Sequence, residues 1–197
     1  MDQKQAKALV RSRLSDKRYE HTINVKKMAV KLAEHYGADE HMVEQAALAA
    51  LLHDAAKELP KEELCALMRQ YPQYAQGGDS RPAPVWHGVC ASILARTEWG
   101  VTDEEVLDAI ACHTAGRPGM TQLDKILYLA DMTSAERDWD GVDKLRKLEM
   151  KDLDAAMLAA LKQSNDYVLS QGKPLDPMSK AAFEDIQRSS GLRAEKL

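Results

Sequence analysis

The chain has 197 residues, of which 45% are apolar and 29% charged, and its formal net charge is −4. This length and balance predict one globular domain with a sizeable core, and the acidic surplus argues against a general nucleic-acid or membrane-surface binder. No apolar run approaches the roughly 20 residues needed to cross a bilayer, and a polar stretch unlike a signal sequence follows Met1.

Helical periodicity runs through almost the whole chain, and no stretch alternates convincingly as a strand would. We therefore expect an all-α fold. A weakly amphipathic helix is predicted over about 3–14, and a longer one from 15 or 16 to 37. On the second helix His21, Val25 and Leu32 follow helical spacing, so His21 should face inward.

The third predicted helix starts after the N-cap Asp39 and ends before Leu59. It is apolar nearly all round and should therefore be central. His53 and Asp54 lie in its most apolar part, and Lys57 should project on the same side one turn later. Burying an imidazole and a carboxylate together costs several kcal/mol unless a charge compensates, and a divalent metal ion binds both groups readily.

A short helix, a loop and a further helix follow along the chain. Pro60 suits the first turn of a short helix, and 71–84 is the most probable loop because proline, glycine and polar residues dominate it. Pro84 should open the next helix, with His87 in its first turn.

A sixth helix is predicted from a capping box formed by Thr102 and Glu105. Val106, Ile110 and His113 share one face of it, so His113 should also face inward.

The last part of the chain should contain three helices. One begins at about Gln122 and carries Asp131 at the edge of its apolar stripe. The following stretch, 134–152, is charged and looks irregular. A long amphipathic helix is predicted over 152–172, and a final one starts at Asp176. Together these predictions describe a single domain over 1–197, with C-terminal helices at 152–190.

Six side chains able to bind metal thus fall on five predicted helices: His21, His53, Asp54, His87, His113 and Asp131. One inward histidine alone is usually a satisfied core residue, but four buried imidazoles with two buried carboxylates need a costly hydrogen-bond network unless a cation is present. Nitrogen and oxygen ligands without thiolate favour iron, manganese, cobalt or zinc. Two ions bridged by Asp54 would use all six ligands.

The other histidines and the cysteines suggest no site. His35 lies in a last turn and His41 in a polar first turn, so both should be at the surface. Cys65, Cys90 and Cys112 have no CxxC spacing and fall in apolar helical patterns, which predicts reduced thiols in the core of a cytoplasmic protein.

The order of a distant histidine, a His-Asp pair and a distant aspartate resembles the HD superfamily of metal-dependent phosphohydrolases. The segments RYEHT, LLHDAAKEL, HTAGRPGM and DKILYLAD are similar to those of the bacterial symmetrical diadenosine tetraphosphatases. The resemblance covers about 18–146. It implies an all-α HD domain, a dinuclear iron-type centre and cleavage of diadenosine tetraphosphate into two ADP.

The same resemblance implies how the ligands are shared. His21, His53, Asp54 and Asp131 would hold one ion, and His87 and His113 the other, with Asp54 as the bridge.

Hydrolysis of a phosphoanhydride needs hydroxide at neutral pH and positive charge on the phosphate oxygens, and a pair of metal ions supplies both. We expect Asp54 and Lys57 to be the catalytic residues. The substrate should be bound by Lys57 and by the following residues: Arg18, Thr114, Arg117 and Arg137.

Two alternatives stay open from the sequence. The protein could be an HD hydrolase of another nucleotide, such as a cyclic or alarmone nucleotide, or an HD module that binds nucleotides without catalysis. A small nucleotide is the expected partner in each case, with no nucleic acid and no membrane. The sequence does not decide between a monomer and a homodimer, or whether 71–84 closes over the substrate.

Overall fold

The protein is described here by a computed structural model that covers residues 1–192. Within these residues there are ten α-helices, two short 3₁₀ helices and no β-strand. The α-helices are α1 (Gln3–Arg13), α2 (Asp16–His35), α3 (Glu40–Leu52), α4 (Lys61–Gln70), α5 (Trp86–Thr97), α6 (Glu104–Cys112), α7 (Gln122–Thr133), α8 (Val142–Glu149), α9 (Leu153–Ser170) and α10 (Pro177–Ser190). The two 3₁₀ helices, η1 (Gly78–Ser80) and η2 (Ala83–Val85), lie between α4 and α5. The predicted all-α fold is confirmed, and no described helix combines the length and apolarity that a membrane span requires.

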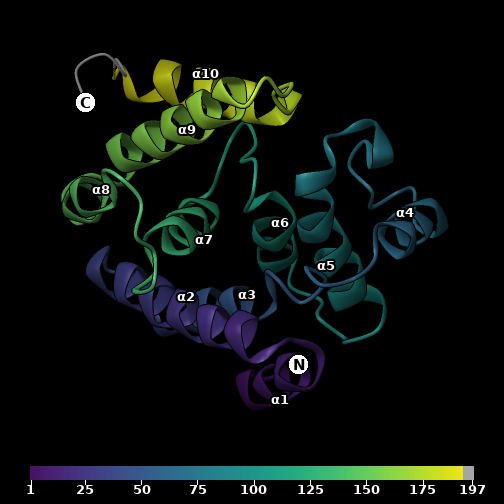
Figure 1. Cartoon of the computed structure of the whole chain (residues 1–197). Helices are drawn as coiled ribbons and strands as arrows, with labels where there is room; N and C mark the ends of the chain where they lie inside the picture. The colour runs from purple at the N-terminus through teal and green to yellow at the C-terminus, as the bar shows by residue number, and fades with distance from the viewer. Residues whose placement is uncertain (193–197) are drawn as a thin grey trace.

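Helix α7 is the centre of the arrangement. Figure 1 shows α1, α2 and α3 on one side of the molecule, α9 and α10 on the opposite side, and α6 and α7 between them. Accordingly, α7 packs against α2, α3, α6, α8 and α9. Leu123, Ile126 and Leu127 are fully buried within this packing. Asp131, near the end of this helix, therefore lies between the N-terminal and the C-terminal helices.

Helix α3 is buried nearly all round, as its sequence predicts, and Asp39 is its N-cap. It ends at Leu52, however, and the prediction that it continues almost to Leu59 was wrong. From Ala55 onward the backbone closes three-residue turns, including Lys57 N–H to Asp54 O at 2.9 Å. Pro60 has no N–H with which to extend the helical ladder, so the chain tightens before α4. The His53-Asp54 pair consequently lies at a helix end.

The start of α6 also differs from the prediction. Asp103, not Thr102, is its N-cap, and its Oδ1 accepts from Glu105 N–H at 3.0 Å and Val106 N–H at 3.3 Å. Aspartate caps a helix as well as threonine does. Gln45 Nε2 donates to Asp103 Oδ2 at 2.8 Å, which holds this side chain in the capping position.

Helix α8 was missed, because the stretch 134–152 was expected to be irregular. Its charged composition hides a short amphipathic helix whose inward residues include Val142 and Leu145. Arg146 on this helix donates to the backbone oxygens of Thr133, Ser134 and Arg137. α8 therefore fixes the segment that leaves α7 beside the candidate site.

Candidate metal centre

The six side chains selected from the sequence lie together in the interior. They come from five places: His21 on α2, His53 and Asp54 at the end of α3, His87 in the first turn of α5, His113 at the C-cap of α6, and Asp131 on α7. Five of them are buried, and Asp131 is half-buried. Their donor atoms form three overlapping groups, in each of which all the atoms lie within 4.8 Å of one another.

Asp54 is the centre of the cluster. Its Oδ2 lies 3.6 Å from His21 Nε2 and 3.5 Å from His53 Nε2. Its Oδ1 lies 3.1 Å from His87 Nε2 and 3.8 Å from His113 Nε2. The two oxygens of one carboxylate therefore face two different pairs of imidazoles.

Three of the histidines are held by their Nδ1 atoms. His53 Nδ1 donates to Ala50 O at 2.7 Å, and His113 Nδ1 donates to Ile110 O at 2.7 Å. His21 Nδ1 donates to the carboxylate of Glu136. A donor proton on Nδ1 leaves Nε2 with its lone pair, which is the form that binds a metal.

For His53 and His113 the electrostatics favour the same neutral form. Burial, together with the charges of His53 and His87, lowers the pKa of His113 to about 3, so this imidazole is neutral at pH 7. Burial also lowers the pKa of His53. For Asp54 burial acts in the opposite direction, but His53 and His87 outweigh it and hold the carboxyl pKa well below its usual range. His53 and His113 are thus neutral beside an ionised Asp54. For His21 burial lowers the pKa, but the contacts with Asp131 and Glu136 outweigh it and raise the pKa.

The basic residues selected from the sequence divide into two groups. Arg18 Nη1 lies 2.8 Å from Asp54 Oδ2, Arg137 Nη2 lies 2.6 Å from Asp131 Oδ1, and Lys57 Nζ lies 3.2 Å from His87 Nε2. These three cations border the cluster.

Arg117 is positioned differently. Its Nε lies 2.9 Å from Asp124 Oδ2 and its Nη1 lies 3.0 Å from Asp108 Oδ2. It does not line the cavity beside the cluster. Asp124 in turn forms a capping box with Thr121 at the start of α7.

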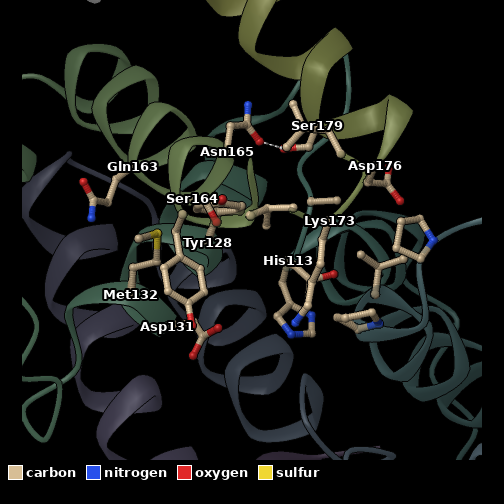
Figure 2. Close-up of a pocket in the computed structure, with 18 of the residues that line it drawn as sticks. His113, Tyr128, Asp131, Met132, Gln163, Ser164, Asn165, Lys173, Asp176 and Ser179 are labelled. Atoms are coloured by element: carbon tan, nitrogen blue, oxygen red, sulfur yellow. Dashed lines mark hydrogen bonds between the residues drawn. The ribbon is translucent and has the colours of Figure 1, made fainter. Parts of the chain in front are cut away.

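A cavity of about 740 Å³ opens beside the cluster. Figure 2 shows His113 and Asp131 at one side of it, and Asn165 and Ser179 from the C-terminal helices at the opposite side. Lys57, Thr114 and Arg137 are also in its wall, near the cluster. Thr114 Oγ1 is buried and has no hydrogen-bond partner among residues 1–192.

Sequence reasoning missed two residues that shape the centre. Glu136 supports His21, and its other contacts are Asn24 Nδ2 at 2.9 Å and Ser134 Oγ at 2.7 Å. Gly88 lies directly after His87, and a Cβ atom there would come within 3.0 Å of His113. Both residues could have been considered from the sequence, because each is close to a selected ligand. Neither glycine nor a single glutamate, however, indicates a metal site by itself.

The residues expected to lie outside the site do so. His35 and His41 are exposed, Cys90 and Cys112 are buried, and Cys65 packs half-buried against the core. Trp86, the first residue of α5, is buried and donates from Nε1 to Arg81 O at 2.8 Å.

The model of the HD domain matches residues 18–136, which include all six side chains of the cluster. This chain belongs to the HD domain family. The membership indicated by the sequence motifs is therefore confirmed. The matched segment begins at Arg18 and ends at Glu136, so it also includes the residue that supports His21.

Named relatives of this HD domain protein cover most of its length. It is 39% identical over 177 residues to the symmetrical bis(5'-nucleosyl)-tetraphosphatase of Bacillus subtilis, covering 90% of this chain and 93% of that one. It is 40% identical to the protein of the same name from Staphylococcus aureus, covering 75% and 74% of the two chains. A crystal structure of a protein from Clostridium acetobutylicum, described as a predicted HD superfamily hydrolase involved in NAD metabolism, superimposes with a TM-score of 0.86 at 34% identity, covering 94% of this chain and 97% of that one.

Proposed function

We propose that this HD domain protein hydrolyses diadenosine tetraphosphate symmetrically into two ADP. The names of its relatives support this substrate and this cut. The observation that carries the chemistry is the position of Asp54, whose two carboxylate oxygens face separate pairs of histidine Nε2 atoms at 3.1 to 3.8 Å.

The donor set fits divalent cations. His53 Nε2 is buried without a hydrogen-bond partner among residues 1–192, which is costly unless a cation binds it. His21 Nε2 lies 3.0 Å from Asp131 Oδ1, a separation that suits two ligands of one ion. Ligand atoms bound to one ion at about 2.1 Å lie about 3.0 to 3.5 Å apart, close to the separations around Asp54. We infer two ions, iron in the first place and manganese or cobalt as alternatives. The ligands of one would be His21, His53, Asp54 and Asp131, and those of the other His87, His113 and Asp54.

Bound divalent cations would supply a water of lowered pKa and positive charge for the phosphate oxygens. In the cleavage, a water oxygen forms a bond to one of the two inner phosphorus atoms. The bond from that phosphorus to the central bridging oxygen breaks, and one ADP leaves with that oxygen. The attacked half, which now carries the water oxygen, is the second ADP, and the proton lost by the water passes to solvent. Lys57 and Arg137, in the cavity wall, would donate hydrogen bonds to the phosphates, and Arg18 would do so from the edge of Asp54.

The test is a product analysis. Protein purified without oxygen and loaded with Fe²⁺, Mn²⁺ or Co²⁺ is incubated with diadenosine tetraphosphate, and the nucleotides are separated by chromatography. We expect ADP as the sole nucleotide product. Formation of ATP and AMP in equal amounts would contradict a symmetrical cut.

A substrate panel tests the alternatives in the same experiment. Cyclic and alarmone nucleotides are offered to the same metal-loaded protein at equal concentration. Faster turnover of one of these would replace the proposed substrate. A protein that binds nucleotides but cleaves none would be a binding module, and the catalytic proposal would be wrong.

We also propose that the whole chain acts as one HD-type domain, with its C-terminal helices docked on the family core. Support comes from α9 and α10, whose residues Met157, Leu161 and Ile186 belong to the same buried cluster as α7. The three free thiols support a cytoplasmic location. Gel filtration would decide between a monomer and a homodimer.

A further inference from the structure

The cavity beside the cluster has two ends of different chemistry. At the cluster end its wall contains Lys57, His113 and Arg137. At the opposite end the wall comes from α9, α10 and the segment between them, and includes the apolar residues Val168 and Leu175. These C-terminal helices lie outside the segment that the HD domain model matches. One charged end and one mainly apolar end suit a ligand with a phosphate part and an uncharged part.

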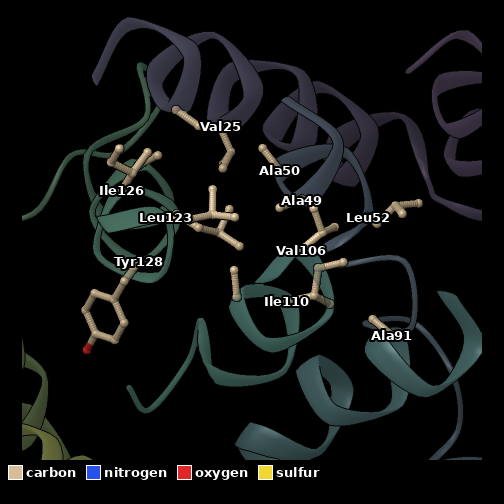
Figure 3. Packing of buried hydrophobic residues seen from close by; sticks show 14 of the residues in the cluster. Val25, Ala49, Ala50, Leu52, Ala91, Val106, Ile110, Leu123, Ile126 and Tyr128 are labelled. Carbon is tan, nitrogen blue, oxygen red and sulfur yellow. The ribbon is translucent and has the colours of Figure 1, made fainter. Parts of the chain in front are cut away.

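Tyr128 on α7 lies in the wall of this cavity. Its side chain leaves the packed core formed with residues such as Leu123 and Ile126 and points toward the C-terminal helices (Figure 3). The residue is only 2% exposed, and its hydroxyl has the Ser164 side chain as a polar neighbour but forms no hydrogen bond of normal geometry among residues 1–192. Burial raises the pKa of Tyr128 to about 12, so the hydroxyl stays protonated and can both donate and accept. A buried hydroxyl of this kind needs a partner from solvent or ligand.

Asn165 on α9 presents a second polar group at the same end. Its Oδ1 accepts from Ser179 Oγ on α10 at 2.6 Å, which orients the side-chain amide. No acceptor among the described residues takes a hydrogen bond from its NH₂ group. Asp176, the acidic residue nearby, is already paired with Arg81 at 2.9 Å. Lys173 is the remaining charged residue in the described wall at this end, and the other hydrogen-bonding groups there, such as Ser164 and Asn165, are uncharged.

We propose that the C-terminal end of the cavity is the nucleoside subsite, and that Tyr128 and Asn165 hydrogen-bond the nucleoside. This inference rests on the proposed function, which assigns the phosphates to the cluster end. The Tyr128 hydroxyl suits a ribose hydroxyl, and the Asn165 NH₂ suits an acceptor on the purine ring. The apolar wall covers the faces of the base. The two residues thus hold the nucleoside, while the cluster acts on the phosphates.

Binding experiments separate the nucleoside from the phosphates. Metal-loaded wild-type protein, Tyr128→Phe and Asn165→Ala are titrated by calorimetry with ADP and with pyrophosphate. Loss of one hydrogen bond weakens binding by about 3- to 10-fold. We expect that loss for ADP in each variant and an unchanged affinity for pyrophosphate, which has no nucleoside. Tyr74→Phe, at a tyrosine outside the cavity, is the matched control and should bind ADP like the wild type.

Folding is checked on the same samples. Tyr128→Phe keeps the ring and removes only the unpartnered hydroxyl, so its melting temperature should equal or exceed that of the wild type. Asn165→Ala loses the contact with Ser179, and its circular dichroism spectrum should still match the wild type. Variants that fold and bind ADP with wild-type affinity would overturn the subsite.

Failure of the subsite and failure of the proposed function give different results. If the wild type cleaves diadenosine tetraphosphate to ADP while both variants keep the wild-type ADP affinity and KM, the subsite is wrong and the function stands. If the wild type cleaves none of it while both variants lose ADP affinity selectively, the function is wrong and the subsite stands. A raised KM with little change in kcat supports both.

Discussion

His21 Nδ1 donates a hydrogen bond to the carboxylate of Glu136, although the two residues are 115 positions apart in the chain. The contact sets the orientation of the imidazole and leaves Nε2 facing Asp54 and Asp131. Glu136 is held in turn by Asn24 and Ser134. A carboxylate behind a metal-binding histidine raises the basicity of the ligand and restricts its rotation.

Removing this support should weaken metal binding. We predict that Glu136→Ala lowers the affinity for the metal about 10- to 100-fold, because His21 loses its fixed tautomer. Glu136→Gln keeps an acceptor oxygen and should recover part of the affinity. The measurement is a titration of metal-free protein with Mn²⁺ or Co²⁺. Glu184→Ala, at an exposed glutamate, is the control, and equal affinities in Glu136→Ala and the control would refute the role.

The bridging position of Asp54 makes a stronger prediction. Asp54→Ala removes both oxygens that face the four histidines, so it should abolish hydrolysis and leave the protein with little bound metal. Elemental analysis and the chromatographic assay measure the two effects. Asp166→Asn, which alters an exposed acid paired with Lys162, should retain metal and activity. Wild-type turnover by Asp54→Ala would exclude a mechanism centred on this carboxylate.

Gly88 should tolerate no side chain. A Cβ atom there would lie 3.0 Å from His113 Cε1 and 3.0 Å from Ile110 O, so α5 and the end of α6 would have to separate. We predict that Gly88→Ala costs about 1 to 3 kcal/mol in the free energy of unfolding. It should also lower metal affinity, because His113 moves. Gly88→Ser should be worse in both respects. Chemical denaturation measures the stability, and a more stable Gly88→Ala would show that the packing is looser than described.

Glu149 should make stability depend on pH. It is 1% exposed, and burial raises the pKa of its carboxyl from about 4.5 to about 7. The folded protein therefore binds this proton more tightly than the unfolded chain does, and stability from this group falls as pH rises from about 4.5 to about 7. Glu149→Gln avoids the charge. Relative to the wild type it should gain about 2 to 3 kcal/mol at pH 8 compared with pH 4.5.

The comparison is made as a difference between the two proteins at each pH, because the histidines of the cluster titrate equally in both. Urea denaturation at a series of pH values gives that difference. If the difference in unfolding free energy between the two proteins stayed constant from pH 4.5 to pH 8, the pKa of Glu149 would not be raised by burial.

The sequence alone determined the helical class, the inward faces and most of the helix starts. Asp39 caps the helix that it was expected to cap, and the helices predicted to begin at about Gln122 and at Asp176 begin there, because a helix start depends on residues within one turn. The inward positions of His21 and His113 also follow from helical spacing within one segment. The His-Asp pair could be selected because two polar groups in an apolar run need compensation.

Only the tertiary structure decided how these segments meet. In the structure α3 ends at Leu52, and Glu136 contacts His21. Arg117 forms ion pairs with Asp108 and Asp124. The tertiary structure also places the C-terminal helices across the cavity from the cluster, where Asn165 and Tyr128 share a wall. Periodicity states which face of a helix is buried but not which partner lies against that face. Such partners are set by packing between residues far apart in the chain, and a local sequence pattern does not predict contacts of this kind.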